Sequence, residues 1–233
     1  MNESRRDQVV AGLASVRQRI DAARQAAGRR DEVALTVVTK TFPASDVDVL
    51  ASLGVADVGE NRDQEGRAKK AAADAPGLRW HMIGQLQRNK AAGVAGWADI
   101  VESVDRMDLV APLARGASSR EHGLDVLIQV CLDPEPAPGR GGADPRTVLA
   151  LADAIAAEPT LHLRGVMGVA PYPGDPDEAF ARLRAVADAV AQRWPGATTV
   201  SAGMSGDLEQ AVRHGATQVR VGGAVLGPRP PVQ

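Results

Sequence analysis

Apolar residues near the start of the chain recur at steps of three and four positions. Val9, Leu13, Val16 and Ile20 follow this spacing, and polar residues, several of them arginines, stand between them. Such a pattern is typical of a helix with one buried face, and Gly28 is a suitable residue to end it. We therefore expect an amphipathic helix ahead of the first strand.

Short runs rich in β-branched and other apolar residues follow at regular intervals, and each is too short for a helix. The first run, residues 34–39, is followed by Pro43, which suits the first turn of a helix that ends at Gly54. The other expected strands are residues 56–59, 80–84, 100–104, 126–130, 163–167, 198–201 and 218–221. A helical stretch follows every expected strand except the last.

Eight strands that alternate with helices in a chain of 233 residues predict an α/β fold, a single (β/α)8 TIM barrel with an extra N-terminal helix. An open doubly wound sheet would show the same local alternation, but no Gly-x-Gly-x-x-Gly sequence follows the first strand. No shift in composition marks a second domain, so residues 1–233 are expected to form one domain. A segment rich in proline and glycine, residues 133–145, follows the fifth strand on the face where barrel enzymes carry their chemistry.

Composition argues against several classes of partner. The chain has 27 basic and 29 acidic residues and only 3% aromatic residues, so no nucleic-acid partner is expected. No run of about 18 apolar residues is present, and the first eight residues lack the apolar stretch of a secretory signal, so no membrane partner is expected either. The single cysteine, Cys131, fits a cytoplasmic protein without disulfides.

One of the four lysines differs from the others in its position. Lys69, Lys70 and Lys90 lie in polar helical stretches, where a solvated surface charge is the ordinary expectation. Lys40 directly follows the first expected strand and should point into the mouth of the barrel. Burial there favours the neutral amine, which attacks carbonyl carbons, whereas a charge reaching out to solvent is the alternative interpretation.

Two turns near the other end of the chain have the features of an anion site. Ser205 follows the seventh strand as a candidate helix N-cap, and Gly222 and Gly223 follow the eighth. Barrels commonly bind phosphate with these two loops, although a plain helix cap and a tight turn would look the same. Arg220, in the last strand, needs a partner, either an acid such as Glu60 or a ring nitrogen.

Several segments occur together in a fixed order over nearly the whole chain: residues 38–41, 59–61, 80–90, 103–105, 163–167, 203–205 and 219–222. In these segments the chain resembles the pyridoxal 5′-phosphate (PLP) homeostasis proteins, which are similar to the barrel domain of alanine racemase without its second domain. The resemblance implies PLP as the cofactor, with the following site residues: Lys40 as a Schiff base, Ser205, Gly222 and Gly223 at the phosphate, Met204 beside it, Arg220 at the pyridine nitrogen and Asn61 nearby.

Three positions depart from the usual pattern of that family. Gly223 stands where the family usually has Thr, so a hydroxyl contact to phosphate would be left to backbone amides. Gln85 and Cys131 stand where His and Asn are usual, and Cys131 is interpreted as a small buried strand residue rather than a nucleophile. His81 belongs to one of the shared segments, and a hydrogen-bonded core histidine is its expected role.

The resemblance implies a monomeric protein that binds and buffers PLP and supplies it to PLP-dependent apo-enzymes, with no metal and no catalytic residue. An arginine at the ring nitrogen disfavours the protonated ring that makes PLP a strong electron sink. No second base is evident, because the one tyrosine, Tyr172, lies in a proline-flanked loop. Two alternatives stay open: a PLP-dependent amino-acid racemase of low activity, and an aldolase that uses Lys40 directly on a sugar phosphate.

Overall fold

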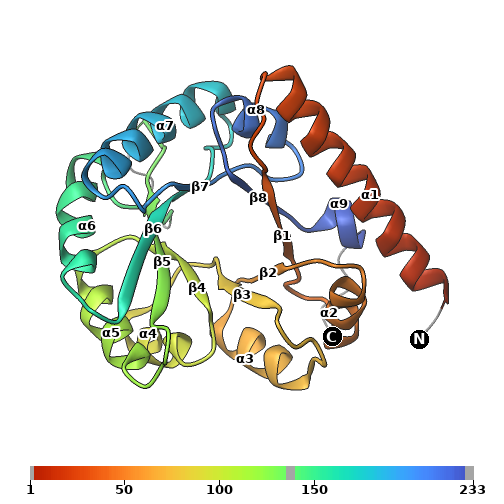
Figure 1. Ribbon diagram of the computed structural model, residues 1–233, viewed down its shortest axis with the longest axis horizontal. Coiled ribbons are helices and arrows are strands. Elements are labelled where there is room, and N and C mark those ends of the chain that lie inside the picture. The colour runs from red at the N-terminus through yellow and green to blue at the C-terminus, as the bar shows by residue number, and fades with distance from the viewer. Residues whose placement is uncertain (1–2, 135–139, 229–233) are drawn as a thin grey trace.

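The structure is a computed structural model that describes residues 3–134 and 140–228. Within these residues, parallel strands pair in sequential order and the eighth pairs with the first, which closes a barrel (Figure 1). The strands are β1 (Ala34–Val38), β2 (Asp57–Glu60), β3 (Arg79–Met82), β4 (Ile100–Val104), β5 (Leu124–Val130), β6 (Leu161–Gly168), β7 (Thr199–Ser201) and β8 (Gln218–Val221). The (β/α)8 barrel expected from the alternation of patterns is confirmed.

Helices surround the barrel and cover the outer face of its strands (Figure 1). In chain order they are α1 (Glu3–Ala26), α2 (Ala44–Ser52), α3 (Asp63–Ala72), α4 (Arg88–Ala95), α5 (Val110–Ala117), α6 (Val148–Ala156), α7 (Pro176–Arg193), α8 (Leu208–Arg213) and α9 (Gly223–Leu226), with short 3-10 turns at Met107–Leu109 and Pro145–Thr147. The extra helix, α1, packs against α8 and α9. In the described part of the chain, no helix is both long enough and apolar enough to cross a membrane.

The observed elements differ from the expected ones at their ends. Strand bounds agree within two residues, and the largest shifts are the earlier end of β3 and the earlier starts of β5 and β6. The expectation that no helix follows the last strand is wrong, because α9 begins directly after Gly222. Its four residues are too few to show a helical period in the sequence. Of the proline-rich segment 133–145, residues 135–139 lie outside the described residues.

The inner and outer faces of the barrel wall carry different kinds of side chain. Outward-facing residues such as Val37, Val58 and Val219 are buried against the helices in one apolar core. The interior instead holds a set of buried polar side chains that hydrogen-bond across strands: Asp57, His81, Glu102, Ser201, Gln218 and Arg220. A typical barrel of this class is filled by branched aliphatic residues, so the polar interior is a departure that calls for a functional explanation.

Strand β6 contains a bulge that only glycine accommodates. Its register against β5 shifts between Leu163 and Gly165, so that Arg164 is an extra residue. Gly165 has a φ of +148°, and a Cβ atom there would lie 2.0 Å from the carbonyl oxygen of Thr199. Backbone in this conformation and a contact this short both exclude a side chain.

We expect Gly165→Ala to lower the free energy of unfolding by about 3 kcal/mol, because the methyl group forces β6 and β7 apart. Urea denaturation followed by circular dichroism measures this loss. The matched control is Gly196→Ala, at an exposed turn where a Cβ atom meets nothing within 4 Å. Equal stabilities of the two variants would contradict the bulge interpretation.

Candidate functional site

A cavity of about 380 Å³, which we call the strand-end pocket, lies just beyond the carboxyl ends of several barrel strands. Its lining includes all seven residues singled out in the sequence: Lys40, Asn61, Met204, Ser205, Arg220, Gly222 and Gly223. The remaining lining residues are Val38, Phe42, Ile83, Met167, Val169 and Gly206. Residues far apart in the sequence therefore meet in one pocket with a mixed polar and apolar wall.

Lys40 lies two residues beyond the end of β1 and is half-buried. Thr39, just before it, donates its backbone N–H to the carbonyl of Gly59 (3.0 Å) and its hydroxyl to Glu60 (2.5 Å). Thr41, just after it, has a φ of +69° and donates its N–H to Glu65 (2.5 Å). Both neighbours of the lysine are thus held in place by hydrogen bonds from outside the pocket.

Arg220 enters the pocket from β8 and is almost fully buried. Its Nη1 donates to the Ser201 hydroxyl (2.5 Å) and its Nη2 to the carbonyl of Gly168 (2.8 Å). Glu102 lies 3.7 Å from Nη1. Burial lowers the pKa of Arg220, while the negative charge of Glu102 opposes that effect. The guanidinium is therefore fixed in orientation by one hydroxyl and one carbonyl, with a compensating carboxylate behind it.

The partner suggested for Arg220 from the sequence, Glu60, is wrong. Side chains alternate between the two faces of a strand, and Glu60 points out of the barrel wall towards α3. There its Oε1 accepts a hydrogen bond from Lys69 Nζ at 2.6 Å. Burial raises the pKa of Glu60, and the hydrogen bonds from Lys69 and Thr39 act in the opposite direction.

Two turns from the C-terminal part of the chain, residues 204–207 and residues 222–223, also contribute to the pocket wall. The prediction that Ser205 caps a helix is wrong, because α8 begins at Leu208 and Asp207 precedes it. Ser205 lies within the turn, which is closed by the Met204 N–H donating to Asp207 (2.6 Å). From α1, Arg19 Nη2 donates to the Ser205 carbonyl (3.0 Å) and its Nε to Glu209 (2.7 Å). The turn is thus supported from its outer side.

The two glycines after β8 differ in their surroundings. A Cβ atom on Gly222 would lie 3.0 Å from the carbonyl oxygen of Val38, so a side chain there would crowd β1. A Cβ atom on Gly223 meets nothing within 4 Å. Gly223 and Ala224 are the first two residues of α9, and N–H groups at the very start of a helix have no partner within that helix, whereas the Val225 N–H already donates to the carbonyl of Gly222. The turn therefore leaves space and backbone donors at the pocket wall.

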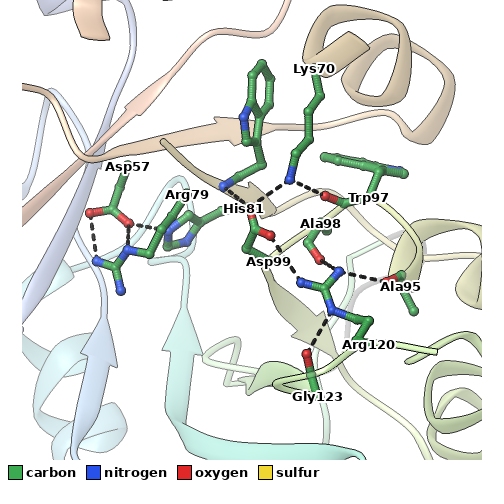
Figure 2. A network of polar contacts seen from close by, with 11 residues as sticks. Asp57, Lys70, Arg79, His81, Ala95, Trp97, Ala98, Asp99, Arg120 and Gly123 are labelled. Atoms are coloured by element: carbon green, nitrogen blue, oxygen red, sulfur yellow. Dashed lines mark hydrogen bonds and ion pairs between the residues drawn. The ribbon is translucent and has the colours of Figure 1, made fainter. Parts of the chain in front are cut away.

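His81 occupies the centre of the polar barrel interior and is fully buried. Its Nδ1 lies 2.6 Å from Glu102 and its Nε2 lies 2.8 Å from Asp57. Burial alone would lower the pKa of His81, but hydrogen bonds to these two carboxylates raise it to about 9. Figure 2 shows that Asp57 is shared between His81 and the more exposed Arg79. A hydrogen-bonded core histidine, as expected, is what the structure contains.

Glu102 connects this interior network to the pocket, and the sequence alone did not single it out. Burial raises the pKa of Glu102, but the hydrogen bond and charge of His81 and the charge of Arg220 lower it overall. Ser201 donates to one of its oxygens (2.5 Å) and Gln218 to the other (2.7 Å). The signal that could have identified this residue is a charge at the centre of a short, mostly apolar strand.

Two further residues were placed wrongly from the sequence. Lys69, expected as a solvated charge, is buried, and its Nζ also donates to the carbonyl of Thr39 at 2.7 Å. The four-residue spacing from Glu65 to Lys69 was the available signal, since such pairs meet on a helix. Cys131 lies one residue past the end of β5 and is partly exposed rather than a buried strand residue.

Comparison with known proteins gives a consistent set of matches. Residues 12–230 match the family model of the alanine racemase N-terminal domain. The chain is 45% identical to the pyridoxal phosphate homeostasis protein of Mycobacterium tuberculosis (strain H37Rv), over 97% of this chain and 94% of that one. It is 36% identical to the protein of the same name from Escherichia coli K12, over 93% and 95%.

Solved structures of other proteins show the same similarity. PipY of Synechococcus elongatus PCC7942, solved with PLP bound, is 32% identical with a TM-score of 0.80, covering 94% of this chain and 100% of that chain. Alanine racemase from Corynebacterium glutamicum has the same barrel, with a TM-score of 0.69 at 14% identity. This chain covers 63% of that enzyme.

Proposed function

The chain belongs to the family of pyridoxal phosphate homeostasis proteins, which are built on the alanine racemase N-terminal domain, and on that premise we propose that it binds PLP in the strand-end pocket. The observation that carries the proposal is the meeting of Lys40, Arg220 and the turn around Ser205 at a single cavity. PLP requires three groups: an amine for its aldehyde, a hydrogen-bond donor for its ring nitrogen, and a turn that binds its phosphate.

We propose that Lys40 holds the cofactor covalently. Its neutral amine would add to the aldehyde carbon, and the aldehyde oxygen would leave as water as the C=N bond of the Schiff base forms. The lysine is half-buried and lines the pocket wall, so its amine would meet an aldehyde bound in the cavity.

The two turns are suited to the phosphate group. Ser205, Gly206, Gly222 and Gly223 all line the pocket, and the Ser205 hydroxyl and the backbone N–H groups of these residues would donate to the phosphate. Without a side chain at Gly222, the phosphate can approach the backbone beside β1. Ile83 and Met167 supply apolar wall for the flat ring, with Asn61 and Met204 at the rim.

The arginine at the ring supports a carrier rather than an enzyme. A guanidinium is permanently protonated and can only donate, so it would leave the pyridine nitrogen unprotonated and the ring a weak electron sink. Tyr172 is 93% exposed and is not among the residues that line the pocket, so it offers no second base for racemisation. We therefore propose that the chain buffers PLP and supplies it to PLP-dependent apo-enzymes.

We also propose that residues 1–233 form one domain in the cytoplasm, because no shift in composition divides the chain and it has a single cysteine. The family resemblance implies that this domain is monomeric. A PLP-dependent racemase of low activity is the second candidate, favoured by the fold shared with alanine racemase. A cofactor-free aldolase reaction at Lys40 has less support, since the solved relative at 32% identity contains PLP.

Reductive trapping tests the proposed attachment. The protein is mixed with PLP and reduced with borohydride, and its peptides are weighed by mass spectrometry. We expect a visible absorbance band before reduction and one added cofactor on the peptide that contains Lys40. Modification confined to other lysines, or no band at all, would refute the proposal.

Transfer and turnover assays separate the carrier from the racemase. Loaded protein is expected to activate a PLP-dependent apo-enzyme while single-enantiomer amino acids keep their optical purity. Rapid loss of optical purity would establish the second candidate instead.

A further inference from the structure

Behind Lys40, outside the barrel wall, lies a largely buried group of charges that we call the Lys69 cluster: Glu60, Glu65 and Lys69. Glu60 ends β2, and the other two residues lie on α3. Lys69 Nζ lies 2.6 Å from Glu60 Oε1 and 3.1 Å from Glu65 Oε1. Only 6% of the Lys69 side chain and none of the Glu60 side chain is exposed.

The Lys69 cluster holds the residues on both sides of Lys40. Upstream, the Thr39 carbonyl accepts from Lys69 (2.7 Å) and the Thr39 hydroxyl donates to Glu60 (2.5 Å). Downstream, the N–H of Thr41 donates to Glu65 (2.5 Å). Because Lys69 contacts both carboxylates, a single buried ammonium connects the supports on the two sides of the pocket lysine.

The backbone just after Lys40 needs such support. Thr41 has a φ of +69°, in the left-handed region that a β-branched residue rarely adopts. Residues in this conformation persist only where their surroundings hold them, and they occur preferentially at functional sites. The bond from its N–H to Glu65 is one such restraint, and Lys69 fixes the carboxylate that accepts it.

A buried ion pair is weak evidence for stability, because the free-energy cost of removing two charges from water offsets their mutual attraction. Its better-attested effect is to fix one arrangement of the groups around it. In this chain the groups that it fixes are the two neighbours of one lysine, on the opposite side of the wall from the pocket.

We propose that Lys69 is a positioning residue for Lys40: through Glu60 and Glu65 it sets the backbone on both sides, so that the pocket amine points at the bound aldehyde. The inference rests on the proposed function and deepens it. It assigns different roles to two lysines. Lys40 would form the bond to the cofactor, and Lys69 would orient Lys40 without touching the cofactor.

The test compares Lys69→Met with Lys70→Met in the full-length protein. Lys70 is the adjacent residue on the same helix, and it contacts the carbonyl of Trp97 (2.7 Å) and Asp99 (2.9 Å) instead (Figure 2). Both substitutions remove one partly or fully buried ammonium, but only the first breaks contacts to the neighbours of Lys40.

Two ligands separate positioning from general damage: PLP, and pyridoxine 5′-phosphate, which has the same ring and phosphate but no aldehyde. In the wild-type protein PLP should bind more tightly, and the affinity ratio reports the covalent step. We expect Lys69→Met to reduce this ratio at least about tenfold and to slow the appearance of the visible band, with pyridoxine 5′-phosphate affinity within about twofold of wild type. Lys70→Met should keep the wild-type ratio.

The outcomes are distinguishable. If Lys69→Met keeps the wild-type ratio and rate, Lys69 has no positioning role, although the proposed function stands. If the wild-type protein forms no visible band with PLP, the proposed function itself fails. If Lys69→Met lacks a cooperative unfolding transition, Glu65→Ala decides, since Glu65 is partly exposed and its loss removes the acceptor for Thr41. A wild-type ratio in that variant would overturn the inference.

Discussion

Lys40→Ala is expected to fold normally, to form no visible band with PLP, and to bind PLP about a hundredfold more weakly than the wild-type protein. Lys40 is the lysine that lines the strand-end pocket, so its removal eliminates the covalent contribution to affinity. The phosphate turns and Arg220 are unchanged and leave a weaker, non-covalent site. Absorbance titration and equilibrium dialysis measure the two effects.

Two matched variants make this result specific. Lys40→Arg keeps a positive charge but cannot form a Schiff base, so it should also lack the band while retaining more phosphate attraction. Lys90→Ala removes an exposed lysine on α4 and should behave as wild type. A visible band of normal intensity in Lys40→Ala would show that PLP is held elsewhere.

The second large effect is expected at His81. His81→Ala removes the hydrogen-bond partner shared by Asp57 and Glu102, which leaves two carboxylates deep in the barrel without it. We expect a loss of about 4 kcal/mol in the free energy of unfolding at pH 7. Urea denaturation gives this value, and His122→Ala, at an exposed histidine, is the control with an expected change below about 0.5 kcal/mol.

The same residue predicts how stability changes with pH. The pKa of His81 is about 9 in the folded protein against an ordinary value of 6.5, so the folded state holds the proton more tightly. Its contribution is complete below about pH 6.5 and falls by about 1.4 kcal/mol per pH unit until pH 9. Glu102 and Asp57 have lowered pKa values, and their contributions are lost instead as the solution becomes acidic.

Denaturation midpoints between pH 6 and pH 10 check this expectation. The wild-type protein should lose stability steadily on the alkaline side, whereas His81→Ala should be nearly insensitive to pH over that interval. Parallel curves for the two proteins would show that the proton on His81 does not support the fold.

The sequence was informative where the signal is local. In strands and helices the pattern of apolar residues repeats every few positions, so the alternation of the two patterns predicted the barrel. Barrel geometry then placed Lys40 at the mouth, because this residue follows a strand. The same rule brought Ser205 and Arg220 to the same pocket, since each lies in or after a neighbouring strand. Their roles towards PLP remain predictions.

The sequence was uninformative where a side chain depends on a distant partner. Lys69 and Lys70 share a polar stretch of sequence, and the packing of α3 against β2 is what buries Lys69 under Thr39. The spacing from Glu65 to Lys69 indicates a pair on one helix face but not its burial. Ser205 was mistaken for a helix cap because the start of α8 depends on Asp207 closing the turn. Glu60 was one of two partners considered for Arg220, because the sequence did not show which face of β2 carries that carboxylate.

The extra helix α1 has a consequence for the speed of exchange. Arg19 supports the Ser205 turn, and Arg5 donates to the carbonyl of Leu226 at the end of α9 (2.9 Å). Both contacts come from α1, outside the strand-end pocket, so under the proposed function the two turns would be held in place before a phosphate arrives, and loading would cost little conformational entropy. Release would then require no local unfolding, and the proposed cargo would leave as fast as its bond to Lys40 breaks, as a protein that is loaded and emptied repeatedly would need.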